Sequence, residues 1–165
     1  MAEIRICHGD ITTSCANYIC HQVNCQGKMN SGVAKAIREK WPRVYEAYME
    51  KINGAVFAGD APFHLGTIQI VALYDDYYKS LRHPCVINMF SQYNYGYDGQ
   101  RYTSYDAFWN CLHLIKNGSV DEKIIAFPWK IGCVRGGANW NIIKAMIEEV
   151  FNEDRFTIEY WKLED

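Results

Sequence analysis

The feature that most constrains the fold is the alternation of short apolar runs with longer segments of helical periodicity. Runs suited to β-strands occur at Ile4–His8, Tyr18–Val23, Thr67–Leu73, Cys85–Phe90, Lys123–Phe127 and Phe156–Trp161. Between them, apolar residues recur at helical spacing in segments 31–40, 42–51, 104–116 and 139–151. This interleaving predicts an α/β domain whose central sheet, of about six strands, is covered by helices on both faces. Ligands of such sheets bind beyond the carboxyl ends of the strands, so we expect the strand-to-helix turns to carry the function.

Size and charge narrow the class of protein. The 165 residues, 49% hydrophobic and 22% charged, predict a single domain over residues 1–165. With 17 basic and 19 acidic side chains the net charge is −2, so no general field attracts nucleic acid or an anionic membrane. No apolar run approaches the roughly 18 residues that span a bilayer, and the first residues lack a secretory signal pattern. We therefore expect a cytoplasmic protein that binds neither nucleic acid directly nor a membrane.

The seven cysteines are odd in number and form no Cys-x-x-Cys pair. None of the five histidines lies near them at the spacing of a zinc site. The pattern predicts reduced, mostly buried thiols and no metal site. We also expect no cofactor.

A glycine-bearing turn joins the second predicted strand to the helix that begins near Val33. It reads Asn24-Cys25-Gln26-Gly27-Lys28-Met29-Asn30-Ser31-Gly32. Gly27 and Gly32 permit positive φ, and the first N–H groups of the helix have no internal partners, so the turn outlines a cradle for an anion. It matches neither the Walker loop nor the three-glycine dinucleotide fingerprint. Taken alone, it fits a plain structural turn equally well.

A second such turn lies between the fifth strand and the last helix. Its sequence is Pro128-Trp129-Lys130-Ile131-Gly132-Cys133-Val134-Arg135-Gly136-Gly137-Ala138-Asn139. The glycines let the backbone come within hydrogen-bonding distance of a ligand. Because both turns lie at the same end of the sheet, together they predict a site that holds a diphosphate from two sides.

At this point the residues resemble a known family. His21-Gln22-Val23-Asn24-Cys25-Gln26-Gly27, Met29-Asn30-Ser31-Gly32-Val33-Ala34 and Ile131-Gly132-Cys133, with Gly136-Gly137 and Trp140, are similar to the macro domains that bind ADP-ribose. The likeness extends to Gly9-Asp10-Ile11 and Asn88-Met89-Phe90-Ser91-Gln92-Tyr93, and so covers essentially the whole chain. It is greatest to the branch of bacterial and phage macro domains, ADP-ribose-1″-phosphate phosphatases and terminal ADP-ribose glycohydrolases.

The resemblance implies a three-layer α/β/α fold with a mixed six-stranded sheet, and it assigns roles to residues. Asp10 would accept a hydrogen bond from the adenine amino group, with Ile11 beside the ring. Backbone groups of Gly32, Val33 and Ala34 would hold the phosphates, and Asn24, Gln26 and Gly27 would face the distal ribose. The expected ligand set is Asp10, Ile11, Asn24, Gln26, Gly27, Met29, Ser31, Gly32, Val33, Ala34, Ser91, Gln92, Tyr93, Ile131, Gly132, Cys133, Val134, Arg135, Gly136 and Gly137.

The chemistry implied by the family depends on two positions where this chain departs from its pattern. The glycohydrolases use a lysine and an aspartate where this chain has Gln92 and Gly136, and Arg135 beside the latter has the opposite charge. Removal of ADP-ribose from modified macromolecules is therefore disfavoured, although ADP-ribosylated macromolecules remain candidate partners.

The phosphatases carry the histidine and asparagine found here as His21 and Asn24. We predict that Asn24 binds ribose hydroxyls or orients water and that His21 is a general acid or base. A core histidine that is only hydrogen-bonded fits the position of His21 inside a strand equally well. The expected function is hydrolysis of ADP-ribose-1″-phosphate, with a non-catalytic ADP-ribose-binding module as the main alternative.

A tyrosine-rich segment, Tyr93-Asn94-Tyr95-Gly96-Tyr97-Asp98-Gly99-Gln100-Arg101-Tyr102, follows the fourth strand. Its glycines favour a loop. We expect Tyr93, Tyr95 or Tyr97 to close the distal end of the pocket.

Overall fold

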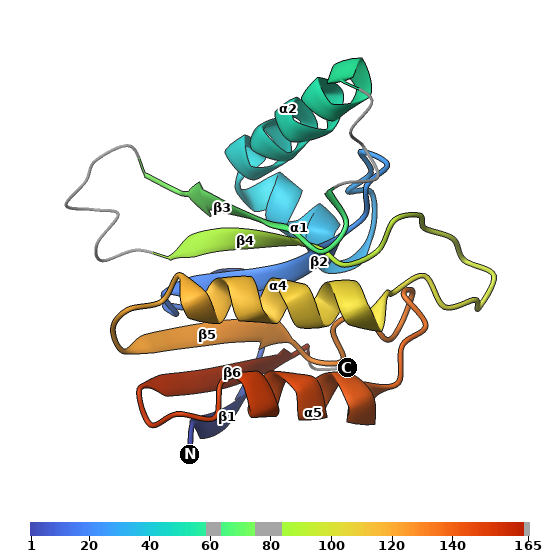
Figure 1. The fold of residues 1–165 in the computed structure, drawn as a ribbon. Helices are drawn as coiled ribbons and strands as arrows, with labels where there is room; N and C mark the ends of the chain where they lie inside the picture. Colours follow the sequence, from blue (N-terminus) through green and yellow to red (C-terminus); the bar gives the residue numbers. More distant parts are fainter. Residues whose placement is uncertain (59–63, 75–83, 164–165) are drawn as a thin grey trace.

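The computed structural model of the protein describes residues 1–58, 64–74 and 84–163 (Figure 1). Its strands are β1 (Glu3–His8), β2 (Tyr18–Val23), β3 (Ile68–Ala72), β4 (Cys85–Phe90), β5 (Lys123–Pro128) and β6 (Phe156–Lys162). Its helices are the 3₁₀ turn η1 (Ile11–Thr13) and the α-helices α1 (Gly32–Lys40), α2 (Pro42–Ala58), α4 (Tyr105–Asn117) and α5 (Trp140–Val150). Each of the six strands and four long helices expected from periodicity is present.

The strands form one sheet in the order β1-β6-β5-β2-β4-β3. Every neighbouring pair is parallel except β3 and β4, which are antiparallel. The predicted mixed six-stranded sheet is therefore confirmed. Strands β2, β4 and β5 lie inside the sheet with helices over both faces, which explains why they read as nearly continuous apolar runs.

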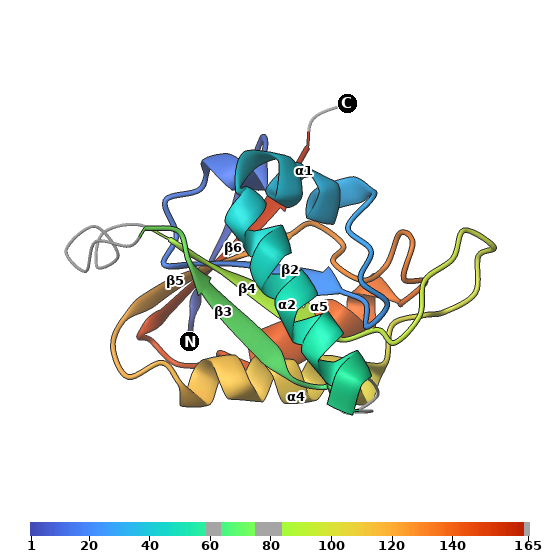
Figure 2. The ribbon, with the colours of Figure 1, turned by 90° about the horizontal axis from the view of Figure 1, so that it is seen from above.

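Helices cover both faces of the sheet, which confirms the three predicted layers. Figure 2 shows α1 and α2 on one side of the sheet and α4 and α5 on the other. On the α4/α5 side, Phe108 and Ile147 are fully buried against β2, β4, β5 and β6. On the α1/α2 side, Ile37 and Val44 pack against Ile19. Apolar packing on both faces thus fixes the sheet between its helices.

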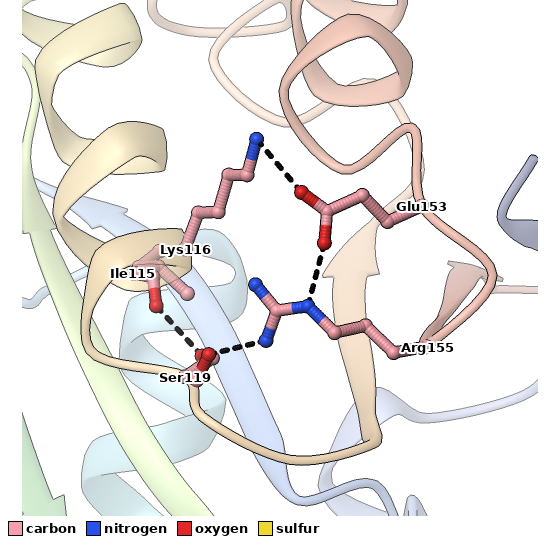
Figure 3. A network of polar contacts seen from close by, with 5 residues as sticks. All are labelled: Ile115, Lys116, Ser119, Glu153 and Arg155. Carbon is pink, nitrogen blue, oxygen red and sulfur yellow. Dashed lines mark hydrogen bonds and ion pairs between the residues drawn. The ribbon is translucent and has the colours of Figure 1, made fainter.

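Polar contacts reinforce the end of the sheet where β5 and β6 begin (Figure 3). Glu153 pairs with Lys116 at 3.2 Å and with Arg155 at 2.6 Å. These two cations hold the pKa of the Glu153 carboxyl below its usual value. Arg155 also donates to the carbonyl of Ser119, whose hydroxyl donates to the carbonyl of Ile115 at 2.7 Å. These contacts join the C-terminal end of α4 to the segment that leads into β6. They lie at the end of the sheet opposite to the carboxyl ends of the parallel strands.

The end of one helix differs from the expectation. Helix α2 was expected to end near Lys51 but continues to Ala58, because Ile52 is buried beside Tyr48 and Phe90 and so favours helix past that point. Ser31 occupies the N-cap of α1, yet its side chain makes no capping hydrogen bond. Within the described ranges, no helix has both the length and the apolar character needed to cross a membrane.

Candidate functional site

A pocket of about 310 Å³ opens at the carboxyl ends of β2 and β5. Three loops line it: the β2–α1 loop (residues 24–31), the β4–α4 loop (residues 91–104) and the β5–α5 loop (residues 129–139). The first and third are the two glycine-bearing turns singled out in the sequence. Both turns therefore line one pocket at the same end of the sheet, and its use as a ligand site stays a prediction.

Most of the predicted catalytic and ligand-binding residues line this pocket. Those that do are His21, Asn24, Ser31, Gly32, Val33, Ala34, Gln92, Ile131, Gly132, Cys133, Val134, Arg135 and Gly136. Those that lie outside its lining are Asp10, Ile11, Gln26, Gly27, Met29, Ser91, Tyr93 and Gly137. Sequence reasoning left out Gln22, Val23, Lys28, Asn30, Gly96, Pro128, Trp129 and Lys130, and it offered Tyr95 and Tyr97 as candidates for closing the pocket.

Asp10 caps the short η1 turn. Its Oδ1 accepts hydrogen bonds from the amide of Thr12 at 2.9 Å and from the Thr12 hydroxyl at 2.8 Å. Ile11, the next residue, is buried in the apolar core of the α1/α2 side. Both residues lie outside the lining of the pocket. Their contact with an adenine ring therefore stays a prediction.

The N-terminus of α1 forms one wall of the pocket through Gly32, Val33 and Ala34. The N-cap Ser31 makes no side-chain hydrogen bond to the first turn. In contrast, Ser104 caps α4 through the amide of Ala107, and Asn139 caps α5 through the amide of Asn141. Uncapped N–H groups at the positive end of a helix dipole bind anions. This wall is therefore suited to a phosphate.

Asn24 organises the β2–α1 loop from inside. Its Oδ1 accepts from the amide of Gln26 at 2.9 Å and lies 2.9 Å from the Tyr48 hydroxyl, and its Nδ2 donates to the carbonyl of Lys28 at 2.9 Å. The residue is only 7% exposed. Both ends of the amide are thus engaged within the protein, so the side chain shapes the loop that faces the pocket.

His21 lies beneath the pocket in a row of polar side chains that crosses the sheet, in which His21 and Asn88 are buried and Gln69 is half-buried. Its Nε2 is 2.5 Å from Asn88 Oδ1, Asn88 Nδ2 donates to Gln69 Oε1 at 3.0 Å, and Gln69 Nε2 donates to the carbonyl of Ala47 at 2.9 Å. Because Asn88 offers its oxygen, Nε2 carries the proton and Nδ1 is an acceptor. Nδ1 is buried and has no hydrogen-bond partner among the described residues. Burial lowers the pKa of His21 to about 4, so the imidazole is neutral at pH 7.

Gln22, near the end of β2, is bonded to the β4–α4 loop and through it to the β5–α5 loop, although sequence reasoning missed it. Its Oε1 accepts from the Ser91 hydroxyl at 2.6 Å, and its Nε2 donates to Gln92 Oε1 at 2.6 Å and to the Thr103 hydroxyl at 2.8 Å. Thr103 in turn donates to the carbonyl of Gly132 at 2.8 Å. No local signal marks Gln22, because its partners lie far along the chain.

We expect Gln22→Met, which keeps the length of the side chain, to lower the free energy of unfolding by about 2 kcal/mol, since three polar partners lose hydrogen bonds. Loosening of the loops should also weaken ligand binding. Urea denaturation and calorimetric titration check both effects. Gln100→Met, at an exposed position of the β4–α4 loop, is the matched control. Equal stability of the two variants would contradict this role.

The charged side chains of the lining are all cations. Lys28, Lys130 and Arg135 line the pocket, and none of the described lining residues is Asp or Glu. The Arg135 guanidinium lies 4.6 Å from the centre of the Tyr97 ring, so the β5–α5 and β4–α4 loops meet through a cation–π contact. The site therefore favours an anionic ligand.

The cysteines nearest the site are not activated. Burial raises the pKa of both Cys25 and Cys133 to about 11, so both thiols are protonated at neutral pH. All seven cysteines are free, as expected, but only Cys20, Cys25 and Cys111 are buried, fewer than the sequence suggested.

Comparison with known proteins identifies the family. Residues 20–147 match the model of the Macro domain, and the chain belongs to this family. An uncharacterized 17.5 kDa protein of Enterobacteria phage T4, from the tk–vs intergenic region, is 27% identical over 164 residues, 96% of this chain and 97% of the phage protein. A solved Bacteroides thetaiotaomicron protein of unknown function has a TM-score of 0.76 at 25% identity, over 98% of each chain.

A further similar structure carries a ligand. Thermosipho africanus DarTG, solved in complex with ADP-ribose, has a TM-score of 0.73 at 14% identity. The match covers 96% of this chain and 41% of DarTG. At this identity the likeness shows a shared fold.

Proposed function

We propose that the pocket binds ADP-ribose or a derivative of it, and that the protein hydrolyses ADP-ribose-1″-phosphate to ADP-ribose and phosphate. The observation that carries the binding is the uncapped N-terminus of α1 in a pocket whose charged side chains are all cations. Membership of the Macro domain family supports ADP-ribose binding. The complex of DarTG with ADP-ribose, a protein of the same fold, adds support.

The diphosphate would lie between α1 and the β5–α5 loop. The amides of Gly32, Val33 and Ala34 on one side and the backbone from Ile131 to Gly136 on the other supply donors without any need for a strongly basic chain. This arrangement accounts for a polyanion site in a protein of net charge −2.

The hydrolytic step would use His21. Water attacks phosphorus and gives one proton to the imidazole, and the imidazole passes that proton to the 1″ oxygen as the bond between this oxygen and phosphorus breaks. The second proton of the water stays on the released phosphate. The buried, unpartnered Nδ1 supports this role, because a lone pair without a partner is free to accept a proton. Since the pKa of His21 is lowered to about 4, its protonation state should not alter the rate between pH 6 and pH 8.

A binding module without turnover is the second candidate, and one observation favours it. Both ends of the Asn24 amide are engaged within the β2–α1 loop, which disfavours a direct role in orienting water. Hydrolysis of ADP-ribosylated macromolecules has weaker support. Gln92 lines the pocket but is tied to Gln22 and to the carbonyl of Asn94, and no carboxylate is present among the described lining residues.

The test combines calorimetric titration of ADP-ribose with incubation in ADP-ribose-1″-phosphate, following release of phosphate. We expect binding, turnover, and loss of turnover in His21→Ala with binding retained. Binding without turnover would select the binding module. Absence of binding to either compound would refute the proposal. The cytoplasmic location expected from the sequence stays a prediction.

A further inference from the structure

Lys130 has a backbone conformation that suits glycine. Its φ is +59°, and among the described residues no other non-glycine residue has a positive φ. The amide of Ile131 donates to the carbonyl of Pro128 at 3.1 Å, so these residues form a β-turn with Lys130 at the third position. Turns with positive φ at this position favour glycine, because a Cβ there crowds the backbone. A lysine at this point is therefore strained.

Contacts within the protein do not explain why a lysine occupies this position. The side chain is exposed, and its ammonium makes no hydrogen bond or ion pair with any residue in the described part of the chain. The turn itself is anchored by its neighbour Trp129, whose ring centre lies 5.1 Å from that of Trp140 and 6.1 Å from that of Tyr160. The base of the Lys130 side chain is thus held firmly while its charged end remains unpaired.

The surroundings indicate what the ammonium is for. Lys130 lines the pocket at the start of the β5–α5 loop, and none of the described lining residues offers a carboxylate. Strained backbone is retained where the conformation or the side chain serves a function. An unpaired cation on a rigid turn, at the edge of an anion cradle, is placed to meet an anionic group of a ligand.

We propose that Lys130 determines affinity by binding a phosphate group of the ligand through its ammonium, and that the strained turn is retained for this contact. The inference rests on the proposed function, since it needs a phosphate-bearing ligand. Trp129, held against the core, sets the direction in which the lysine leaves the turn. At position 130, glycine would therefore favour the stability of the fold, whereas lysine favours the affinity for the ligand.

The test is Lys130→Gly, followed by thermal unfolding and by calorimetric titration with ADP-ribose. Relief of strain is expected to raise the Tm by about 2–4 °C. Loss of the charged contact is expected to weaken ADP-ribose binding about tenfold. A change that stabilises the fold and weakens binding separates a ligand contact from a general structural role.

Three further variants sharpen the result. Lys130→Ala should lose the same affinity without the gain in Tm, because its Cβ keeps the strain. Lys130→Arg should retain most of the affinity. Lys28→Gly should not raise the Tm, because Lys28 is not at a positive φ.

The outcomes distinguish this inference from the proposed function. Wild-type protein that binds ADP-ribose, together with Lys130→Gly that binds it equally tightly, would overturn the role of Lys130 alone. If the Tm did not rise in Lys130→Gly, the claim that Lys130 lowers the stability of the fold through backbone strain would be wrong. Wild-type protein that binds neither ADP-ribose nor inorganic pyrophosphate would overturn both proposals.

Discussion

Gly136→Ala is expected to lower the free energy of unfolding by about 3 kcal/mol and to abolish ADP-ribose binding. A Cβ on Gly136 would overlap the Thr103 hydroxyl and the carbonyl oxygen of Gly132, and it would lie 3.0 Å from Gln22 Nε2. These atoms belong to the hydrogen-bond network that joins Gln22 of β2 to the β4–α4 and β5–α5 loops. The methyl group would thus push the β5–α5 loop away from the network that positions it.

The neighbours of Gly136 have little freedom to move aside. The amides of Tyr102 and Thr103 donate to its carbonyl at 2.8 and 3.0 Å, which ties Gly136 to the β4–α4 loop. Thr103 is also 2% exposed and fixed by Gln22. Relief of the overlap therefore requires displacement of two loops rather than rotation of one side chain.

Gly99→Ala provides the control. Gly99 has a φ of +77°, but a Cβ at this position would meet no heavy atom within 4 Å, so only backbone strain of about 1 kcal/mol is expected there. Urea denaturation measures both variants, and calorimetry measures their binding. If Gly136→Ala lost no more stability than Gly99→Ala and still bound ADP-ribose, the close packing of the loops would not control the pocket.

The elements of the fold were predictable because each carries a local signal. The run Cys85–Phe90 is apolar because β4 is covered on both faces, and the spacing of Ile143 and Ile147 marks the buried side of α5. The same reasoning fails where local and tertiary effects conflict. The pair Asn53-Gly54 is a usual end of a helix, yet α2 continues through it to Ala58.

The site was predictable as two loops but not as a set of contacts. Glycines and the first residues of the following helices marked the β2–α1 and β5–α5 loops, because a backbone that binds an anion needs glycines and free helix N–H groups at neighbouring positions in the sequence. Gln22 gave no such signal, because its partner Thr103 lies far along the chain and is brought next to it only by the folded sheet and the β4–α4 loop. The environment of His21 likewise depends on Asn88 in a neighbouring strand. Side-chain partners brought together by tertiary structure are therefore the part that sequence reasoning missed.

The pH dependence of stability should report the burial of His21. Burial lowers the pKa of this imidazole from 6.5 to about 4, and the hydrogen bond with Asn88 offsets only part of that effect. Between these two values the unfolded chain binds a proton that the folded chain does not, so the free energy of unfolding falls as the pH falls. The loss should approach about 3 kcal/mol near pH 4 and be absent above pH 7.

Urea denaturation between pH 7 and pH 4 tests this, with the difference in stability between wild type and His21→Gln as the measured quantity. Glutamine keeps a donor for Asn88 but has no group that titrates in this range, so the difference should shrink as the pH falls. His8→Gln removes an exposed histidine and is the matched control, because burial is the cause of the effect. If the curves of wild type and His21→Gln stayed parallel, the imidazole would not be held neutral by burial. The rate of hydrolysis would then vary with the protonation of His21 between pH 6 and pH 8, contrary to the expectation for an imidazole that is neutral throughout this range.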